Sequence, residues 1–397
     1  MVYEIQRVTL KGSLVLYLQK PNNEQHFRPS SPPACFTHRN RRFAGVARPT
    51  RNAVQCYMKE LVFSGVNLSD RLLEELDPAL GLGGPVVILS VSRRTDIPAF
   101  YSDWFFRRLK EGFVLVRNPM NAHQVSRVSL DPSVIDCIVF WTKDPSKMLD
   151  KLHLLEDYQY YFQITITPYG KQLEPGLPPK DDLVVAFREL AERIGKERVI
   201  WRYDPIIFTT ELDVDFHTRA FAQLAHGLAG YTERCVISFL DLYQKTARNI
   251  RPLGQTYMTE ANMRRLAANI APIARDRGLV LETCSEKTDL ATDFGIRHGK
   301  CIDPELISRI VGQELSLEKD PYQRAECGCV SSIDIGAYNT CPHGCLYCYA
   351  NFNQRVVADQ VRRHNPSSPL LVGEISTEDK ITEREMVSLA SRQLKLF

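Results

Sequence analysis

Cysteine is the residue type in this chain whose spacing points most clearly to chemistry. Seven of the eleven cysteines lie within one stretch of 65 residues. They are Cys284, Cys301, Cys327, Cys329, Cys341, Cys345 and Cys348. In a reducing compartment, clustered thiols bind metals more often than they form disulfides. The clustering therefore predicts metal binding in this part of the chain.

The last three of these cysteines form a compact motif in the segment IDIGAYNTCPHGCLYCYAN, spaced C-x3-C-x2-C. Three thiolates on one loop can bind three irons of a 4Fe–4S cluster and leave the fourth iron open to a cofactor or substrate. Tyr347 precedes the third cysteine and could shield one face of such a cluster. A zinc site with His343 as its fourth ligand is the alternative. The count of three cysteines and the aromatic neighbour favour iron–sulfur over zinc.

The other four clustered cysteines could bind a second metal centre. Cys284, Cys301, Cys327 and Cys329 would give either a second iron–sulfur cluster or a zinc site. Four thiolates make a closed site, which suits electron relay or structural bracing. Two alternatives stay open. Some of these residues could be free buried thiols, and Cys327 and Cys329 could belong to the surroundings of the first cluster.

The elements that must position these cysteines form an alternation of short apolar runs and amphipathic helices. The expected strands are Val86–Ser92, Val134–Thr142, Tyr160–Thr167, Arg198–Asp204, Cys235–Asp241, Gly278–Cys284 and Ser331–Tyr338. In one expected helix, Leu183, Phe187 and Leu190 recur at helical spacing, and in another Asp213 or Asp215 is the expected cap. Repeated strand–helix units predict an α/β fold, a complete or partial (β/α) barrel with a two-strand excursion around FVLVRNPMNAHQVSRVSL. A doubly wound open sheet is the competing architecture.

Polar side chains stand at the ends of several expected strands. In a parallel barrel these strand ends meet at one mouth, where active sites lie. The candidates are Arg93, Arg94 and Asp96 for binding a cofactor, and Arg202, Asp204 and Ser238 for catalysis. A structural ion pair is the alternative for Arg202 and Asp204.

Four regions of the chain differ in composition. Residues 1–56 carry nine Lys or Arg against two acidic residues and are expected to be a poorly ordered basic extension. Residues 57–84 are expected to be a linker or helical lead-in. The barrel is expected over residues 85–374, with the cysteine-rich part at 284–348, and a helical tail over 375–397.

The cluster loop resembles that of the radical S-adenosylmethionine (radical SAM) enzymes. Together with CGC, IDIG and YNTC, and with SRRTDIPAF, NPMN, FWTKDP and RYDPI upstream, it is similar to an uncharacterised bacterial and archaeal family with cysteines near the C-terminus. The nearest named relatives of that family are the spore photoproduct lyases. The resemblance implies a 4Fe–4S cluster on Cys341, Cys345 and Cys348, S-adenosylmethionine as cofactor with Tyr347 beside it, and reductive cleavage of that cofactor to start radical chemistry. It also implies a cellular electron donor.

The order of the motifs departs from the radical SAM pattern, in which the cluster loop follows the first strand. A circular permutation would reconcile the two, with strand Ser331–Tyr338 lying beside Val86–Ser92. The Gly-Gly-Glu segment that holds the methionine amino group is also missing. The run Leu370–Glu374 ends in Gly-Glu, so Glu374 is the candidate for that role.

Charge and hydropathy limit the partners. The chain has 50 Lys and Arg against 47 Asp and Glu, a net charge of +3, which argues against a long nucleic-acid footprint. The apolar runs are shorter than the ~20 residues of a membrane span, so a cytoplasmic protein is expected. The substrate is expected to be a small molecule or nucleotide, with nucleic acid as a weaker alternative. A non-catalytic zinc or iron–sulfur scaffold is the second function considered.

Overall fold

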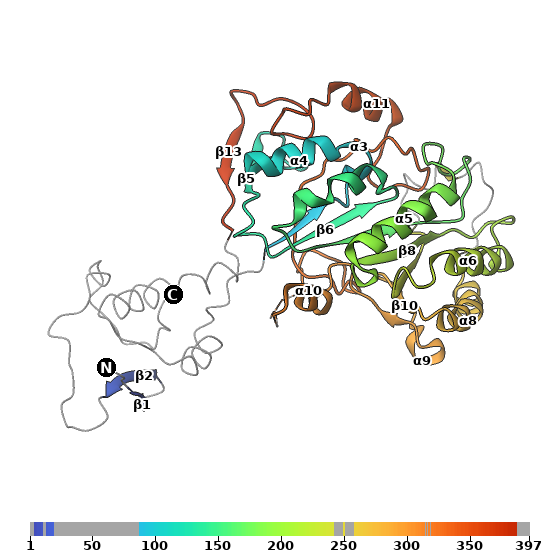
Figure 1. Cartoon of the computed structure of the whole chain (residues 1–397), viewed down its shortest axis with the longest axis horizontal. Coiled ribbons are helices and arrows are strands. Elements are labelled where there is room, and N and C mark those ends of the chain that lie inside the picture. Colours follow the sequence, from blue (N-terminus) through green and yellow to red (C-terminus); the bar gives the residue numbers. More distant parts are fainter. Residues whose placement is uncertain are drawn as a thin grey trace. The chain divides into compact units, whose positions relative to one another are not determined.

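The computed structural model describes residues 87–241, 249–250, 258–313, 315, 317 and 319–386, together with two strands near the N-terminus (Figure 1). The chain divides into two compact units, Met1–Gly84 and Pro85–Phe397. In the first unit, β1 (Glu4–Leu10) pairs antiparallel with β2 (Ser13–Gln19). These two strands lie within residues 1–56, for which the poorly ordered extension stays a prediction. The rest of residues 1–84 lies outside the described residues.

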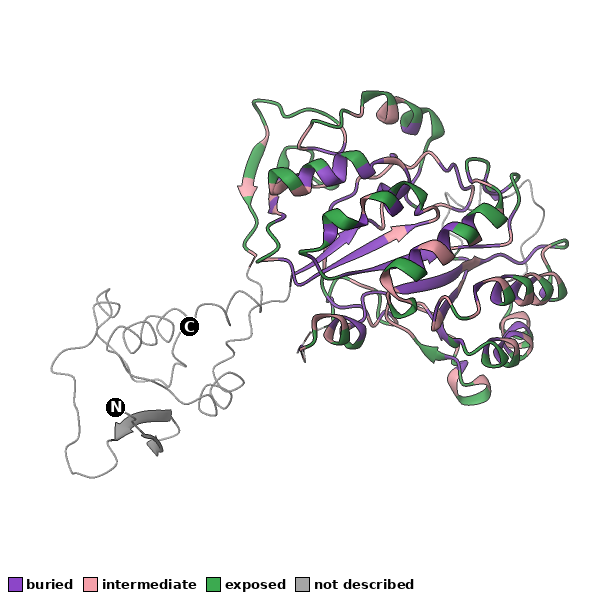
Figure 2. Ribbon diagram, viewed as in Figure 1, coloured by how far each residue is buried: buried purple, intermediate pink, exposed green. Residues whose placement is uncertain are grey.

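The second unit is built on an eight-stranded parallel sheet, which confirms the α/β class. Its order is β12 (Ile333–Asp334), β3 (Ile88–Val91), β6 (Cys137–Thr142), β7 (Tyr160–Thr165), β8 (Val199–Ile206), β9 (Arg234–Phe239), β10 (Val280–Thr283) and β11 (Arg297–His298). All seven expected strands are present, and β11 is the additional one. The central strands β3, β6 and β7 are almost entirely buried, as expected for a parallel sheet covered on both faces (Figure 2).

The edge strand β12 comes from the cysteine-rich part of the chain. It pairs parallel with β3, with Ile333 opposite Leu89 and Asp334 opposite Ser90. The Asp334 carboxylate strengthens this short pairing, because it accepts hydrogen bonds from Ser90 Oγ at 2.9 Å and Ser92 Oγ at 2.7 Å. The predicted position of this strand, beside the first strand of the sheet, is therefore confirmed.

Helices flank the sheet (Figure 1). They are α3 (Ile97–Phe100), α4 (Ser102–Glu111), η2 (Ser146–Leu155), α5 (Lys180–Ile194), η3 (Lys196–Arg198), α6 (Val214–Leu228), α8 (Glu260–Asp276), α9 (Ala291–Phe294), α10 (Pro304–Val311) and α11 (Gln354–Arg363). The apolar stripe predicted from Leu183 and Phe187 is the buried face of α5. Asp213 is the cap of α6, since its side chain accepts a hydrogen bond from the Phe216 amide at 2.7 Å.

The two faces of the sheet enter different cores because side chains alternate along each strand. Phe140, Phe162 and Trp201 belong to the large core shared with the helices. Val139 and Tyr161 point to the other face, in a smaller core that includes α10 and four of the clustered cysteines. This second core fills only part of that face. The remainder, toward the carboxyl ends of the strands, lines the cavity described below.

The expected two-strand excursion is the antiparallel pair β4 (Phe113–Arg117) and β5 (Gln124–Ser129). A third strand, β13 (Lys380–Glu383), pairs parallel with β5. The expected helical tail is therefore wrong for these four residues, and residues 387–397 lie outside the described range. The reason is the free edge of β5, which offers backbone partners to an extended segment such as Lys380–Glu383. Arg117 reinforces the pairing through two bonds to the Asp379 carboxylate, at 2.6 and 2.8 Å.

Among the described residues, no helix has the length and apolar character needed to cross a membrane.

Candidate functional site

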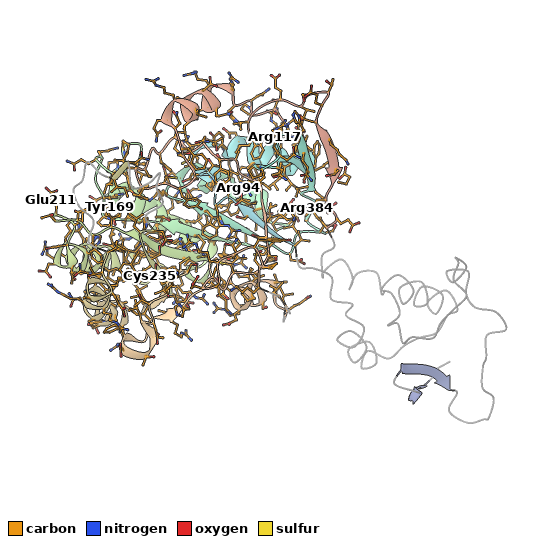
Figure 3. The ribbon with its side chains drawn as sticks, turned by 180° about the vertical axis from the view of Figure 1, so that it is seen from behind. Arg94, Arg117, Tyr169, Glu211, Cys235 and Arg384 are labelled. Carbon is orange, nitrogen blue, oxygen red and sulfur yellow. The ribbon has the colours of Figure 1, made fainter. Side chains whose placement is uncertain are left out.

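A cavity of about 570 Å³ opens where the parallel strands end. All seven clustered cysteines line it. The six polar residues at strand ends that the sequence suggested for cofactor binding or catalysis also line it. These are Arg93, Arg94 (labelled in Figure 3), Asp96, Arg202, Asp204 and Ser238. Its volume is typical of sites for small molecules and cofactors.

The cluster loop is fixed by backbone hydrogen bonds to the segment after β7. The Gly176 amide donates to the His343 carbonyl at 2.9 Å, and the Leu346 amide donates to the Leu173 carbonyl at 3.0 Å. A Cβ atom on Gly176 would lie only 2.7 Å from the His343 carbonyl oxygen. This close approach therefore requires glycine at position 176, and it holds the loop against the sheet.

The three cysteines of the loop lie in a largely apolar setting. Cys345 and Tyr347 are buried in a small core with Tyr169 and Leu173, against which Cys348 packs. Burial raises the pKa of the Cys345 thiol to about 12, although the nearby Lys143 ammonium acts in the opposite direction. The thiols are thus protonated and shielded as they stand, and a bound metal would be needed to stabilise their ionised form.

A buried ion network that no sequence pattern indicated supports the loop. Glu174 is 1% exposed and accepts hydrogen bonds from Lys143 at 2.8 Å, and from Lys180 and the Tyr347 hydroxyl. Burial alone would raise the pKa of Glu174, but Lys143 and Lys180 lower it to about 2. Glu174 is therefore ionised at neutral pH, and it orients the predicted cluster-shielding ring of Tyr347.

Asp96 positions the loop from the opposite side. Its carboxylate contacts His343 Nε2 at 2.8 Å, accepts a hydrogen bond from Thr142 Oγ1 at 2.7 Å, and caps α3 through the Ala99 amide at 3.0 Å. Asp96 is 5% exposed, so its oxygens are engaged by the protein. Nδ1 of His343 is buried and has no hydrogen-bond partner. Asp96 therefore supports the cysteine loop, and its expected contact with a cofactor stays a prediction.

The other four cysteines form a row on the cavity wall. Cys284 Sγ lies 3.2 Å from Cys301 Sγ. Cys329 lies close enough to Cys301 and to Cys327 to shift the pKa values of both thiols. Arg202 Nη1 also donates to Cys301 Sγ at 2.8 Å. The structure thus brings together four thiols that are spread over 46 residues of sequence.

The three candidate catalytic residues form one connected group. Arg202 and Asp204 make an ion pair, and the Ser238 hydroxyl donates to the Asp204 carboxylate. Arg202 is only 5% exposed, and burial is outweighed by Cys301 and Asp204, which raise its pKa. Arg202 and Asp204 therefore form an ion pair and also line the cavity, because the pair lies in the cavity wall.

Two further observations concern Glu374 and the arrangement of possible metal ligands. Glu374 does not line the cavity, and its backbone carbonyl accepts a hydrogen bond from Arg117 at 2.9 Å, beside β4. The segment before β13 leads to the three-stranded sheet, and the expected contact of Glu374 with a cofactor stays a prediction. As the side chains stand, the described residues contain no group of three or more His, Cys, Asp or Glu that could hold a metal ion.

Comparison with known proteins gives a family and no function. No curated protein matches the chain. A family model described as a domain of unknown function, DUF1848, matches residues 88–350, about two thirds of the chain. This range contains the sheet and all seven clustered cysteines. Neither comparison names a radical SAM enzyme or a spore photoproduct lyase, so that likeness stays a prediction. The chain belongs to the DUF1848 family, whose function is unknown.

Proposed function

We propose that this protein is an iron–sulfur enzyme of the radical SAM type. Cys341, Cys345 and Cys348 would hold a 4Fe–4S cluster, and S-adenosylmethionine would bind beside it in the cavity. The observation that carries the proposal is that three thiols of a single tightly held loop line a cavity of about 570 Å³. When bound, such a cluster supplies the electron for reductive cleavage of the cofactor, which starts radical chemistry on a substrate.

The residues of the loop fit this group in donor type and in surroundings. Thiols are the protein ligands of iron–sulfur clusters, and three of them leave one iron open. Each thiolate of a cluster binds a different iron, whereas the ligands of a single metal ion must converge on one point. The side chains therefore need not form a single-ion site before a cluster is inserted. Lys143 lies close enough to lower the pKa of Cys345 and would offset the negative charge of bound thiolates.

The chain's own residues hold the cysteine loop in position and shield it from water. The Gly176 and Leu346 backbone bonds hold the loop, and the Glu174 network fixes the ring of Tyr347. The packing of Cys345 and Cys348 excludes water from one side of the loop. We propose in addition that the sheet is a partial, circularly permuted barrel, since β12 takes the first place in the sheet and β11 ends it.

The row of four thiols favours a second candidate function, a metal-braced binding module. A second cluster or a zinc ion on these cysteines would fix the end of β10 to the segment that carries Cys301 and Cys329. In this case the barrel would bind a ligand without radical chemistry. Metal identity separates the two proposals, because iron–sulfur proteins are coloured and zinc–thiolate sites are not.

The test uses full-length protein purified and reconstituted without oxygen. Iron, sulfide and zinc are measured, and electron paramagnetic resonance (EPR) spectra of the reduced protein are recorded with and without S-adenosylmethionine. The triple variant Cys341/Cys345/Cys348→Ala is compared with Cys137→Ala, a buried cysteine outside the cavity. We expect a signal that shifts with the cofactor in wild type and in the control and is absent in the triple variant. Zinc alone, or a signal indifferent to the cofactor, would contradict the enzyme proposal.

A further inference from the structure

One cation in the cavity wall lacks an acidic partner. Of the charged residues that line the cavity within the described ranges, Arg202 is paired with Asp204, Arg324 with Asp241, and Lys143 with Glu174. Arg94 lies 3.9 Å from the Asp334 carboxylate. Among the described residues, the Arg93 side chain has no carboxylate within 4 Å, and its one hydrogen bond goes to the neutral Ser332 hydroxyl at 3.1 Å.

Strand order explains where Arg93 lies. It follows β3, and β3 stands between β12 and β6 in the sheet. Its side chain reaches Ser332, just before β12, on one side. On the other side its guanidinium carbon lies 5.9 Å from the centre of the Trp141 ring on β6. Arg202, from β8, approaches the same ring at 5.4 Å. Trp141 thus lies near two guanidinium groups, only one of which is neutralised by a carboxylate.

The indole of Trp141 gives a second, independent sign of a missing partner. The protein has three tryptophans. Trp104 donates its indole N–H to the Ser368 carbonyl at 2.8 Å, and Trp201 donates to the Ile166 carbonyl at 3.0 Å. Nε1 of Trp141 is shielded from solvent but has no hydrogen-bond partner in the part of the chain that the structure describes. Because an indole N–H can only donate, its partner must be an acceptor.

We propose that Arg93 and Trp141 form a subsite for an anionic oxygen group, a carboxylate or a phosphate, of the substrate. Guanidinium groups bind both oxyanions through charge-assisted hydrogen bonds, and the indole can add one more donor. An anion here would neutralise Arg93 and satisfy Trp141 together. The inference extends the proposed function by giving the class of its substrate, and it rests on that function only for the reaction that follows binding.

Intrinsic fluorescence tests this subsite directly. Trp104 and Trp201 are fully buried, so Trp141 is the tryptophan that can respond to a ligand in the cavity. Full-length protein as purified is titrated with inorganic phosphate and, separately, with malonate as a dicarboxylate. Potassium chloride at equal ionic strength is the reference. We expect a saturable change with at least one of the two anions, and the better one identifies the oxyanion. A response no different from that to chloride would overturn the proposal.

Variants assign the response to Arg93. Arg93→Gln is expected to weaken binding of the better anion by about tenfold or more, and Arg93→Lys by less, because lysine keeps the charge but loses the fork geometry. The matched control is Arg107→Gln, since Arg107 lies on α4 and bonds to Ser367 outside the cavity. Unchanged binding in a folded Arg93→Gln protein would refute the assignment.

Anion binding in the presence of S-adenosylmethionine tests the subsite separately from the cluster proposal. If Arg93 serves the substrate, the anion still binds when S-adenosylmethionine is present. If the cofactor displaces the anion, Arg93 holds the cofactor instead, and the substrate assignment is wrong. Anion binding can fail while the EPR signal still responds to the cofactor, and the reverse can also occur. The two failures are therefore distinguishable.

Discussion

Replacing Gly176 by alanine probes the contact that holds the cysteine loop in place. The new Cβ would lie 2.7 Å from the His343 carbonyl oxygen, 2.8 Å from the Pro342 carbonyl oxygen and 2.9 Å from the His343 Cα. All three atoms belong to the backbone, so no side-chain rotation relieves the clash. Either the loop moves and weakens the 2.9 Å hydrogen bond between the Gly176 amide and the His343 carbonyl, or the segment after β7 that carries Gly176 moves.

The cost follows from these contacts. Overpacking of this kind destabilises by about 1–3 kcal/mol, and loss of the hydrogen bond alone would cost about 0.5–1.5 kcal/mol. In a large domain this lowers the melting temperature by about 2–6 °C. The displaced loop should also retain less iron after reconstitution. The effect on melting should appear in metal-free protein as well, because the clash does not depend on a cluster.

Gly170→Ala is the matched control for this experiment. Gly170 lies six residues earlier in the same segment, and a Cβ there meets no atom within 4 Å. Thermal melting and iron content are measured for both variants and for wild type. We expect Gly170→Ala to behave as wild type. Equal melting temperatures and equal iron content in the two variants would show that the close approach at Gly176 does not hold the loop.

Two further substitutions test the supports of the site. Glu174→Gln leaves Lys143 and Lys180 without their shared carboxylate and should destabilise by about 3 kcal/mol at pH 7. The carboxylate's contribution is present above its ordinary pKa of 4.5 and is lost as the pH falls toward about 2, so the difference in urea midpoint from wild type should shrink over that range. Asp334→Ala removes the acceptor for Ser90 and Ser92, and hydrogen exchange should show lost protection at β12 but not at α5. An unchanged midpoint difference in acid, or retained protection at β12, would contradict these predictions.

The sheet could be predicted because its strands are short runs of buried apolar residues. Cys137–Thr142 and Tyr160–Thr165 are nearly all buried, so their composition reflects their position. The short strand β11 could not be predicted, since Arg297 and His298 are exposed and carry no pattern. Nor could β13, because it depends on the free edge of β5, which is more than 250 residues away in the chain.

The cysteines of the site were evident from spacing, but their supports were not. Glu174 acts through Lys143, which is 31 residues away, and Tyr347, which is 173 residues away. Pairings of this kind leave no local trace in a sequence. Arg93 was a candidate from the sequence, but its lack of a carboxylate partner among the described residues could not be predicted, because that depends on the folded cavity wall. Polar strand ends correctly indicated which residues would meet, and only the structure shows what each one contacts.

Because β3 pairs with β12, the cavity wall can be completed only late in synthesis of the chain. The Ser90 and Asp334 side chains that join these strands are 244 residues apart. At the usual rates of translation, β3 waits about 10–50 s for its neighbour to be made. During that time its edge is open to wrong partners. The cysteine loop follows β12, so it is the last part of the wall to emerge from the ribosome. The arginines and the row of four thiols are therefore already synthesised when the three proposed cluster ligands appear, so insertion of the proposed cluster would come at the end of biogenesis.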